Sequence, residues 1–204
     1  MKYLSTVLLF VFTAACSHVL AAVGPAQQLK DTIKHSLDVI YGESYASASL
    51  EEKQRLIRDV VEQEYNLDIL IRRAIGRNWD FIREDEQPQV LELVKQLVVK
   101  AYINGLNGHA RPKLSFGQTV VVLDKRMEVP SVVVTEDNTI NVLYRLGLMQ
   151  SGWEIYDIVA EDISVVSNYR QQFDDHFRQG NGAELIKKLK DLLGREELDA
   201  TIEL

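Results

Sequence analysis

Cysteine is almost missing from this chain of 204 residues, because Cys16 is the only one. One cysteine cannot build a disulfide framework, and a domain of about 180 residues buries enough surface to fold without one. A glycine-rich phosphate loop is missing too. The sequence Gly-Asn-Gly at 180–182 is too short for one and is typical of a break between helices.

Basic charge is also scarce, with 23 lysines and arginines against 30 acidic residues and a net charge of −7. This balance argues against general nucleic-acid binding, which needs a basic surface to neutralise phosphates. It argues equally against a polybasic protein of the membrane surface.

Clustered metal ligands and catalytic pairs are not apparent in the sequence. The four histidines are scattered, at His18, His35, His109 and His176. Residues 174–176 read Asp-Asp-His, but consecutive positions of a helix point in different directions. We therefore expect no metal site, no catalytic residues and no cofactor.

The first 22 residues carry a single charge, at Lys2, followed by an uncharged and mostly apolar run at 4–16. Thirteen residues are too few to span about 30 Å of hydrocarbon as a helix, but they suit a secretory signal. We predict cleavage after Ala21 or Ala22, which gives a signal peptide at 1–21 and one domain at 22–204. An uncleaved anchor, or a lipoprotein acylated at Cys16, are the alternatives.

Helical periodicity dominates both ends of the predicted domain. It predicts helices at Pro25–Tyr41, from a Ser49 cap to about residue 65, at Leu67–Ile75 and at 85–106. Glu52 stands three residues after Ser49, as in a capping box. Two more helices follow Ser164 and are separated at 181–182.

Between the helices, residues 113–161 follow the periodicity of strands. Segments 119–123, 129–135, 139–148 and 153–160 are rich in β-branched and aromatic residues. Short polar breaks between them predict hairpins, and hence an antiparallel meander. We expect an α+β fold with a curved, mostly antiparallel sheet of four or five strands.

Several of these strands are apolar on both faces, as at 120–123, 132–134 and 142–144. Antiparallel sheets normally keep one face wet, so a sheet with two apolar faces must be covered twice or must face an apolar ligand. Helices on both sides would satisfy this, and so would a pocket on one side. The helix at 90–106 has apolar residues on more than one narrow stripe, so it is either buried broadly or borders two apolar compartments.

Three segments resemble a known family. They are YNLDILIRRAIGRNW at 65–79, GWEIYD at 152–157, and a helix entry with Ser164, SNYR at 167–170 and Phe173. In this order they are similar to MlaC-type phospholipid-binding proteins, the toluene-tolerance auxiliary family of the Mla pathway, over roughly residues 25–193. Two features depart from the family pattern: Asp162 stands where glycine is frequent, and the turn at 148–151 lacks basic residues.

The resemblance implies an NTF2-like cone around an apolar pocket. It also implies a soluble periplasmic carrier of glycerophospholipids, which works with an outer-membrane lipoprotein complex and an inner-membrane ABC transporter to maintain outer-membrane asymmetry. When the two acyl chains of a phospholipid leave a bilayer for water, on the order of 30 methylenes become exposed, at a free-energy cost of about 0.8 kcal/mol each. Polar contacts of about 1 kcal/mol cannot offset that, so aliphatic and aromatic side chains must enclose the lipid tails.

Apolar residues of the long helix, the strands and the next helix are therefore the candidates for the pocket wall. They are Tyr102, Ile103, Val120, Val122, Val142, Tyr144, Ile155, Ile158, Val165 and Tyr169. Arg145 and Arg170 are candidates for a lipid phosphate, because guanidinium groups bind phosphate oxygens in pairs. Each residue also has an ordinary alternative, as part of the core or of an ion pair.

Two other functions stay open on the sequence. An NTF2-like enzyme could use a buried Asp157 as a base. A structural interaction protein would fill its core with its own side chains and bind no ligand.

Overall fold

The computed structural model describes residues 24–106 and 108–195. The predicted signal peptide and Cys16 lie outside the described residues. The helices are α1 (Pro25–Tyr41), α2 (Leu50–Glu62), α3 (Leu67–Ile75), α4 (Gln87–Asn104), α5 (Val165–Phe177) and α6 (Gly182–Leu193). Two short 3-10 turns, η1 (Glu43–Tyr45) and η2 (Gly76–Phe81), connect them. In this part of the chain, no helix combines the length and the apolar character needed to cross a membrane.

The sheet has six antiparallel strands in the described residues: β1 (Lys113–Phe116), β2 (Val120–Leu123), β3 (Arg126–Val134), β4 (Thr139–Met149), β5 (Gly152–Ala160) and β6 (Ile163–Ser164). From β3 to β6 it is the predicted meander. Beside β3, β1 and β2 share one edge: β1 pairs with the end of β3 and β2 with its beginning. The predicted α+β class is confirmed, whereas β1 and β6 raise the strand number above the expected four or five.

Local sequence signals explain where the helices begin and end. Pro25 stands in the first turn of α1, where its missing amide hydrogen costs nothing. The Ser49 side chain caps α2 by accepting from the Glu52 amide at 3.1 Å, and Asn181 with Glu184 forms a complete capping box on α6. Gly76 ends α3 with a φ of +61°, a conformation that favours glycine.

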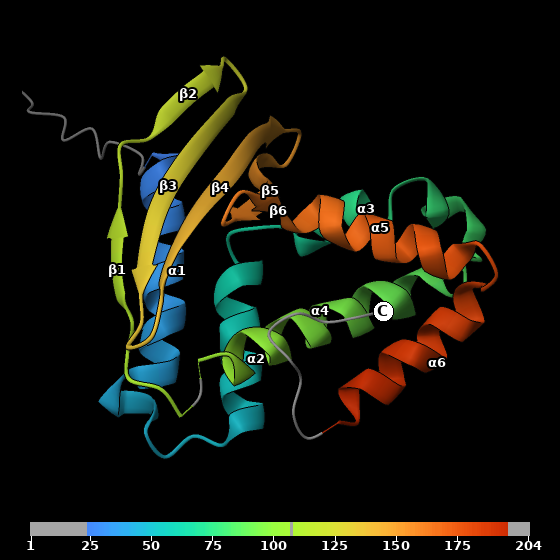
Figure 1. The fold of residues 1–204 in the computed structure, drawn as a ribbon, viewed down its shortest axis with the longest axis horizontal. Coiled ribbons are helices and arrows are strands. Elements are labelled where there is room, and N and C mark those ends of the chain that lie inside the picture. The colour runs from blue at the N-terminus through green and yellow to red at the C-terminus, as the bar shows by residue number, and fades with distance from the viewer. Residues whose placement is uncertain (1–23, 107, 196–204) are drawn as a thin grey trace, which may run out of the picture.

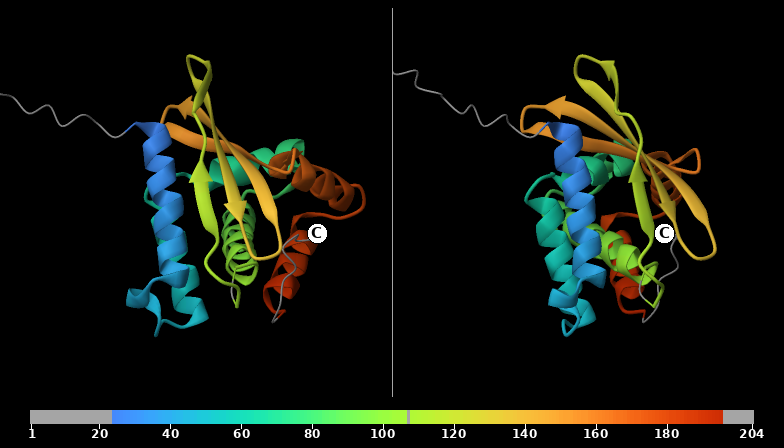
Figure 2. Two further views of the ribbon diagram at one scale, coloured as in Figure 1. Left: turned by 60° about the vertical axis from the view of Figure 1, so that its left-hand side comes forward. Right: turned by 90° about the vertical axis from the view of Figure 1, so that its left-hand side faces the viewer.

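Alternate residues of β3 and β4 divide the sheet into two faces. The inner face carries Met127, Val129 and Ser131 of β3, paired with Leu146, Tyr144 and Val142 of β4. Helix α1 lies along this face (Figures 1 and 2) and packs Leu29 and Ile33 against it. The outer face carries the intervening residues.

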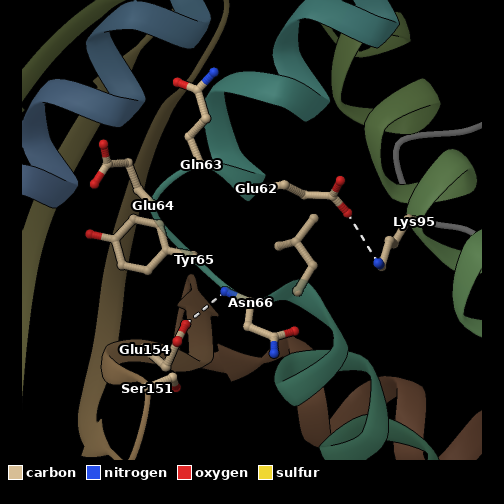
Figure 3. A pocket seen from close by; sticks show the side chains of 9 residues that line it. Glu62, Gln63, Glu64, Tyr65, Asn66, Lys95, Ser151 and Glu154 are labelled. Carbon is tan, nitrogen blue, oxygen red and sulfur yellow. Dashed lines mark hydrogen bonds and ion pairs between the residues drawn. The ribbon is translucent and has the colours of Figure 1, made fainter.

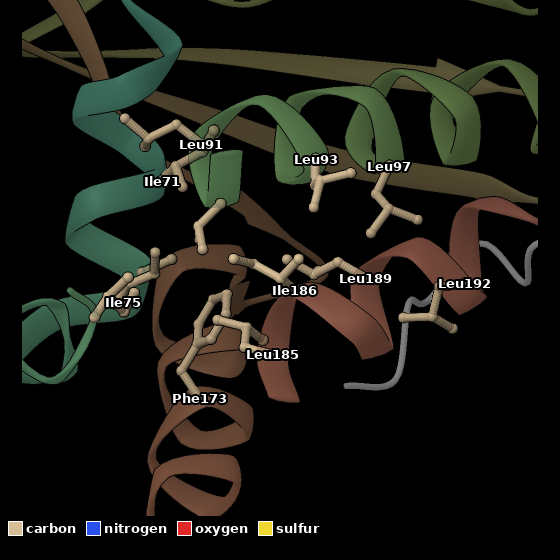
Figure 4. Packing of buried hydrophobic residues seen from close by; sticks show 13 residues of the cluster. Ile71, Ile75, Leu91, Leu93, Leu97, Phe173, Leu185, Ile186, Leu189 and Leu192 are labelled. Carbon is tan, nitrogen blue, oxygen red and sulfur yellow. The ribbon is translucent and has the colours of Figure 1, made fainter. Parts of the chain in front are cut away.

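Three apolar clusters hold the helices and the sheet together. The first joins α3, α4, α5 and α6 around Phe173 and Leu189 (Figure 4). The second joins α1 to the inner face of the sheet, and the third joins α1, α2 and α4 around Ile57 and Ile103. Helix α4 belongs to two of these clusters, and so does α1. These two helices therefore connect the helical part of the molecule to the sheet.

Candidate functional site

The inner face of the sheet is sealed along only half of its length. At the half nearer the β2–β3 turn, Met127, Val129 and Leu146 are fully buried beneath Leu29 of α1 and Tyr65. At the half nearer the β3–β4 turn, the apolar side chains of the same face are only partly buried: Val133, Ile140, Val142 and Ile158. The sheet therefore keeps accessible apolar surface on its inner face.

Helix α4 supplies apolar surface opposite that half of the sheet. One side of the helix packs Leu93 and Leu97 against α6, and another packs Val99 and Ile103 against α1 and α2. Its third side carries Val98 and Tyr102, one turn apart, which are 41% and 37% exposed. This side of α4 is therefore accessible apolar surface near the partly buried half of the sheet.

Two tyrosines bring α4, α1 and β4 together next to this surface. The Tyr102 hydroxyl lies 3.1 Å from Ser36 Oγ of α1, and Ser36 in turn donates to the Ile33 carbonyl. Tyr144 of β4 is close enough to Tyr102 for the two phenols to interact electrostatically. We call the partly accessible apolar surface of Val98, Tyr102, Val142 and Tyr144 the apolar hollow, because it is the candidate wall of a lipid site.

The polar groups of the apolar hollow are uncharged. Burial raises the pKa of Tyr144, the nearby Tyr102 raises it further, and a hydrogen bond with Ser131 opposes the shift. Burial likewise raises the pKa of Tyr102, against a smaller opposite effect of its hydrogen bond with Ser36. Both phenols therefore stay neutral well above pH 7. The hollow offers aliphatic surface and a few neutral hydroxyls.

Four of the ten predicted wall residues border this region: Tyr102, Val142, Tyr144 and Ile158. Ile103 is fully buried in the cluster of α1, α2 and α4, and Ile155 packs beneath α1. Val165 and Tyr169 share one side of α5, where Tyr169 packs against the cluster around Phe173.

Val120 and Val122 lie elsewhere. They are on β2, at the edge of the sheet, and about half of each side chain is exposed. Of the two alternatives that the sequence left open for this two-faced strand, cover by helices on both sides is not what the structure shows. It pairs with β3 alone, at the end of the sheet away from the apolar hollow.

The two arginines predicted to meet a phosphate differ in their surroundings. Arg145 lies on the outer face, where it forms ion pairs with Glu128 and Asp157, both at 3.1 Å. Arg170 of α5 donates through Nε to the Arg73 carbonyl at 3.2 Å and packs beside Gly76. The two guanidinium groups therefore have different partners.

Ser36, Val98 and Ser131 contribute to the region and escaped the sequence analysis. Val98 belongs to the helix that was identified as broadly apolar, so its type was visible although its role was not. The two serines gave no signal, because a buried hydroxyl on an inner face becomes apparent only when its hydrogen-bond partners are known.

The carboxylate of Asp157 has a structural role, because its contacts are hydrogen bonds within the fold. It is 7% exposed, and its carboxylate accepts from Ser164 Oγ, the Ile158 amide, the Val166 amide and Arg145. These donors tie the beginning of α5 to β5. A carboxylate with every lone pair engaged lacks the free acceptor that a general base needs.

A polar cavity of about 470 Å³ lies at the junction of α2 and α3 (Figure 3). Lys95 bridges Glu62 at 3.1 Å and Asp68 at 2.7 Å on one side, and Glu154 accepts from the Asn66 amide at 2.7 Å on the other. The ring of Tyr65 separates this cavity from the cluster beneath α1. Its charged lining is unsuited to acyl chains. Among the described residues, no group of His, Cys, Asp and Glu is arranged to hold a metal.

Together, the six-stranded open antiparallel sheet and the surrounding helices define an α+β fold. The chain belongs to the MlaC protein family, whose sequence profile matches residues 30–191. It is also similar in structure to a phospholipid-binding protein from Ralstonia solanacearum, solved in complex with a phospholipid. The TM-score is 0.70 at 20% identity, over 80% of this chain and 93% of that one, which shows a shared fold. Comparison with curated proteins gives no match.

Proposed function

We propose that this protein is a periplasmic carrier that binds the acyl chains of a glycerophospholipid in the apolar hollow. The observation that carries the proposal is the accessible apolar surface of Val98 and Tyr102 opposite Val142 and Tyr144. Membership of the MlaC family and the phospholipid bound by the Ralstonia protein support it. They also favour a binding or transport protein over an enzyme.

The chemistry of the hollow suits the energetic demand of this task. Moving two acyl chains from a bilayer into water costs roughly 20–25 kcal/mol of free energy, and only enclosure by apolar groups can offset this cost. The aliphatic side chains would cover the tails, and the neutral hydroxyls of Tyr102 and Tyr144 would meet the less apolar end of the lipid.

Membership of the MlaC family supports a proposed cellular role. We propose that residues 1–21 are a cleaved signal peptide and that residues 22–204 form one domain. In the proposed pathway, this domain exchanges lipid with an outer-membrane lipoprotein complex and with an inner-membrane ABC transporter, and so maintains outer-membrane asymmetry. The carrier needs no cofactor, because lipid binding and release involve no covalent step.

Organic extraction and mass spectrometry of the purified mature protein test the proposal. We expect phospholipid in amounts comparable to the protein. The variants Val142→Trp and Tyr144→Trp should lower the recovered lipid, because the larger ring fills the hollow, whereas Val120→Trp on the exposed β2 should leave it unchanged.

Two outcomes would count against the proposal. A folded protein that carries no lipid and accepts none from vesicles would favour the structural interaction protein. Unchanged lipid recovery in both Val142→Trp and Tyr144→Trp would remove these residues from the binding surface.

A further inference from the structure

An exposed apolar strand projects from the end of the molecule away from the hollow. All four side chains of β2, Val120 to Leu123, are 51–67% exposed. Leu148 of β4 is 41% exposed and lies beside this hairpin, since its amide donates to the carbonyl of Lys125 in the β2–β3 turn. Figure 1 shows the β2–β3 hairpin reaching beyond the other strands. We call these five residues the apolar tip.

Exposure of the apolar tip is unusual because it includes both faces of one strand. Val120 is paired with Glu128, whose side chain is on the outer face, and Val121 with Met127 of the inner face. Neither valine is covered by a helix. A typical antiparallel edge keeps one face wet and polar, so four consecutive aliphatic residues here require a separate explanation.

Arginines without acidic partners adjoin the apolar tip. Arg126, paired with Leu123, and Arg73 of α3 both lie against the ring of Tyr156, at 5.6 Å and 5.2 Å from its centroid. Within residues 24–106 and 108–195, neither arginine forms an ion pair with a carboxylate. We call Arg73 and Arg126 the arginine rim.

The bulge in β5 builds this arrangement. The pairing with β4 shifts between Arg145 and Leu146, so that Tyr156 stands opposite no residue. Its ring packs against Gly147, where an added Cβ would lie only 3.2 Å away. The freed ring gives two guanidinium groups one flat surface beside the hairpin.

From these observations we infer that the apolar tip and the arginine rim dock the protein on an anionic phospholipid surface. The apolar tip would enter between the acyl chains, and the arginine rim would bind headgroup phosphates. In a chain of net charge −7, only a local cationic region can make this contact. The inference concerns a surface of the protein and does not depend on the proposed cargo.

A bilayer fits the apolar tip better than a protein partner does. A partner strand would pair with the free backbone edge of β2 and leave both side-chain faces exposed, whereas fluid acyl chains can surround the side chains on both faces at once. Four residues extend only about 13 Å, which suits shallow insertion and excludes spanning.

Flotation of the mature protein with vesicles tests the inference. Vesicles of phosphatidylethanolamine and phosphatidylglycerol should carry the protein with them, and vesicles of phosphatidylcholine alone should carry much less. The double variant Val121→Asp/Leu123→Asp, and separately Arg73→Glu/Arg126→Glu, should weaken binding to the anionic vesicles about tenfold or more.

Matched variants control for charge and for lost apolar surface. Ile163→Asp changes an equally exposed aliphatic residue on β6, and Arg178→Glu changes an exposed arginine at the C-cap of α5, so both variants should bind as the unmodified protein does. If the charge reversals unfold the hairpin, Leu123→Trp provides a second readout. Its fluorescence should shift to the blue on anionic vesicles and be quenched by brominated lipid.

Two results of the flotation experiment would overturn the inference: no flotation, or flotation that the tip variants leave unchanged. A third would come from native membrane vesicles, if removing their own proteins abolished binding of the carrier. The last result would point to a protein receptor. Concentration-dependent dimers that the tip variants abolish would instead make the apolar tip a contact between copies. Lipid extraction from the same samples separates this inference from the proposed cargo: loaded protein that does not float would contradict the docking alone.

Discussion

Tyr102 shows how a single residue combines packing with a polar link. Its ring lies on the accessible side of α4, and its hydroxyl lies 3.1 Å from Ser36 of α1. Tyr102→Phe should cost only about 1 kcal/mol of folding stability, because Ser36 keeps its bond to the Ile33 carbonyl. Urea unfolding of the lipid-free protein measures this. A loss above about 3 kcal/mol would mean that the hydroxyl has a further buried partner.

Asp157 is the residue for which we expect the largest structural effect. Asp157→Ala leaves Arg145 with one carboxylate partner and leaves the beginning of α5 without its anchor. We expect a loss of about 3 kcal/mol or more in the free energy of unfolding. Asp157→Asn, which keeps an acceptor, should lose less, and chemical denaturation can compare the two. Equal stability of both variants with the unmodified protein would contradict the anchoring role.

Glu92 makes stability depend on pH in the acidic range. Its hydrogen bond with Arg58, at 2.5 Å and 2.6 Å for the two oxygens, lowers the pKa of the carboxyl to about 2 from 4.5. A lowered pKa in the folded state adds stability above about pH 4.5, and this stability is lost as pH falls toward 2. Since the side chain is 42% exposed, the effect should stay below about 1 kcal/mol. Glu92→Gln should reduce the difference in unfolding free energy between pH 6 and pH 3.

Among the elements, α6 depends on its beginning. The Asn181 side chain accepts from the Glu184 amide, and Glu184 accepts from the Asn181 amide, each at 3.1 Å. Asn181→Ala should lower the free energy of unfolding by about 1 kcal/mol, since it leaves helix amides without a partner. Because Leu185 and Leu189 pack against α4, the same variant should speed hydrogen exchange in α6. If Asn181→Ala increased hydrogen exchange only in other elements and not in α6, the capping role of Asn181 would be contradicted.

The bounds of the helices could be predicted because their signals are local. Pro25–Tyr41 and Leu67–Ile75 match α1 and α3, and the Ser49 cap is confirmed. The strands were less predictable at their edges. β1 was not identified as a separate strand, since Lys113–Phe116 is short and pairs with residues nearly 20 positions away. Strand pairing is a property of two segments, and one segment alone does not show it.

At the scale of the whole molecule, lipid binding should stabilise the fold. A ligand that binds only the folded state adds RT ln(1 + [L]/Kd), about 2.7 kcal/mol at a hundredfold excess over Kd. For a domain of this size, that amount raises Tm by roughly 5–10 °C. Calorimetry of the protein before and after delipidation measures the shift. Identical Tm values, in a preparation shown to lose its lipid, would argue that the apolar hollow is not the binding site.

Residue order alone was sufficient for the α+β class, the helix caps, the family and the two-faced character of the strands. These properties depend on side-chain types and spacings within a few residues. Which apolar faces are covered was decided only in the folded molecule, because coverage depends on how distant elements meet. β2 and the inner face of β4 are equally apolar in the sequence. In the folded protein, β2 projects into solvent beside arginines that have no carboxylate partner, whereas the inner face of β4 borders the apolar hollow next to α1 and α4.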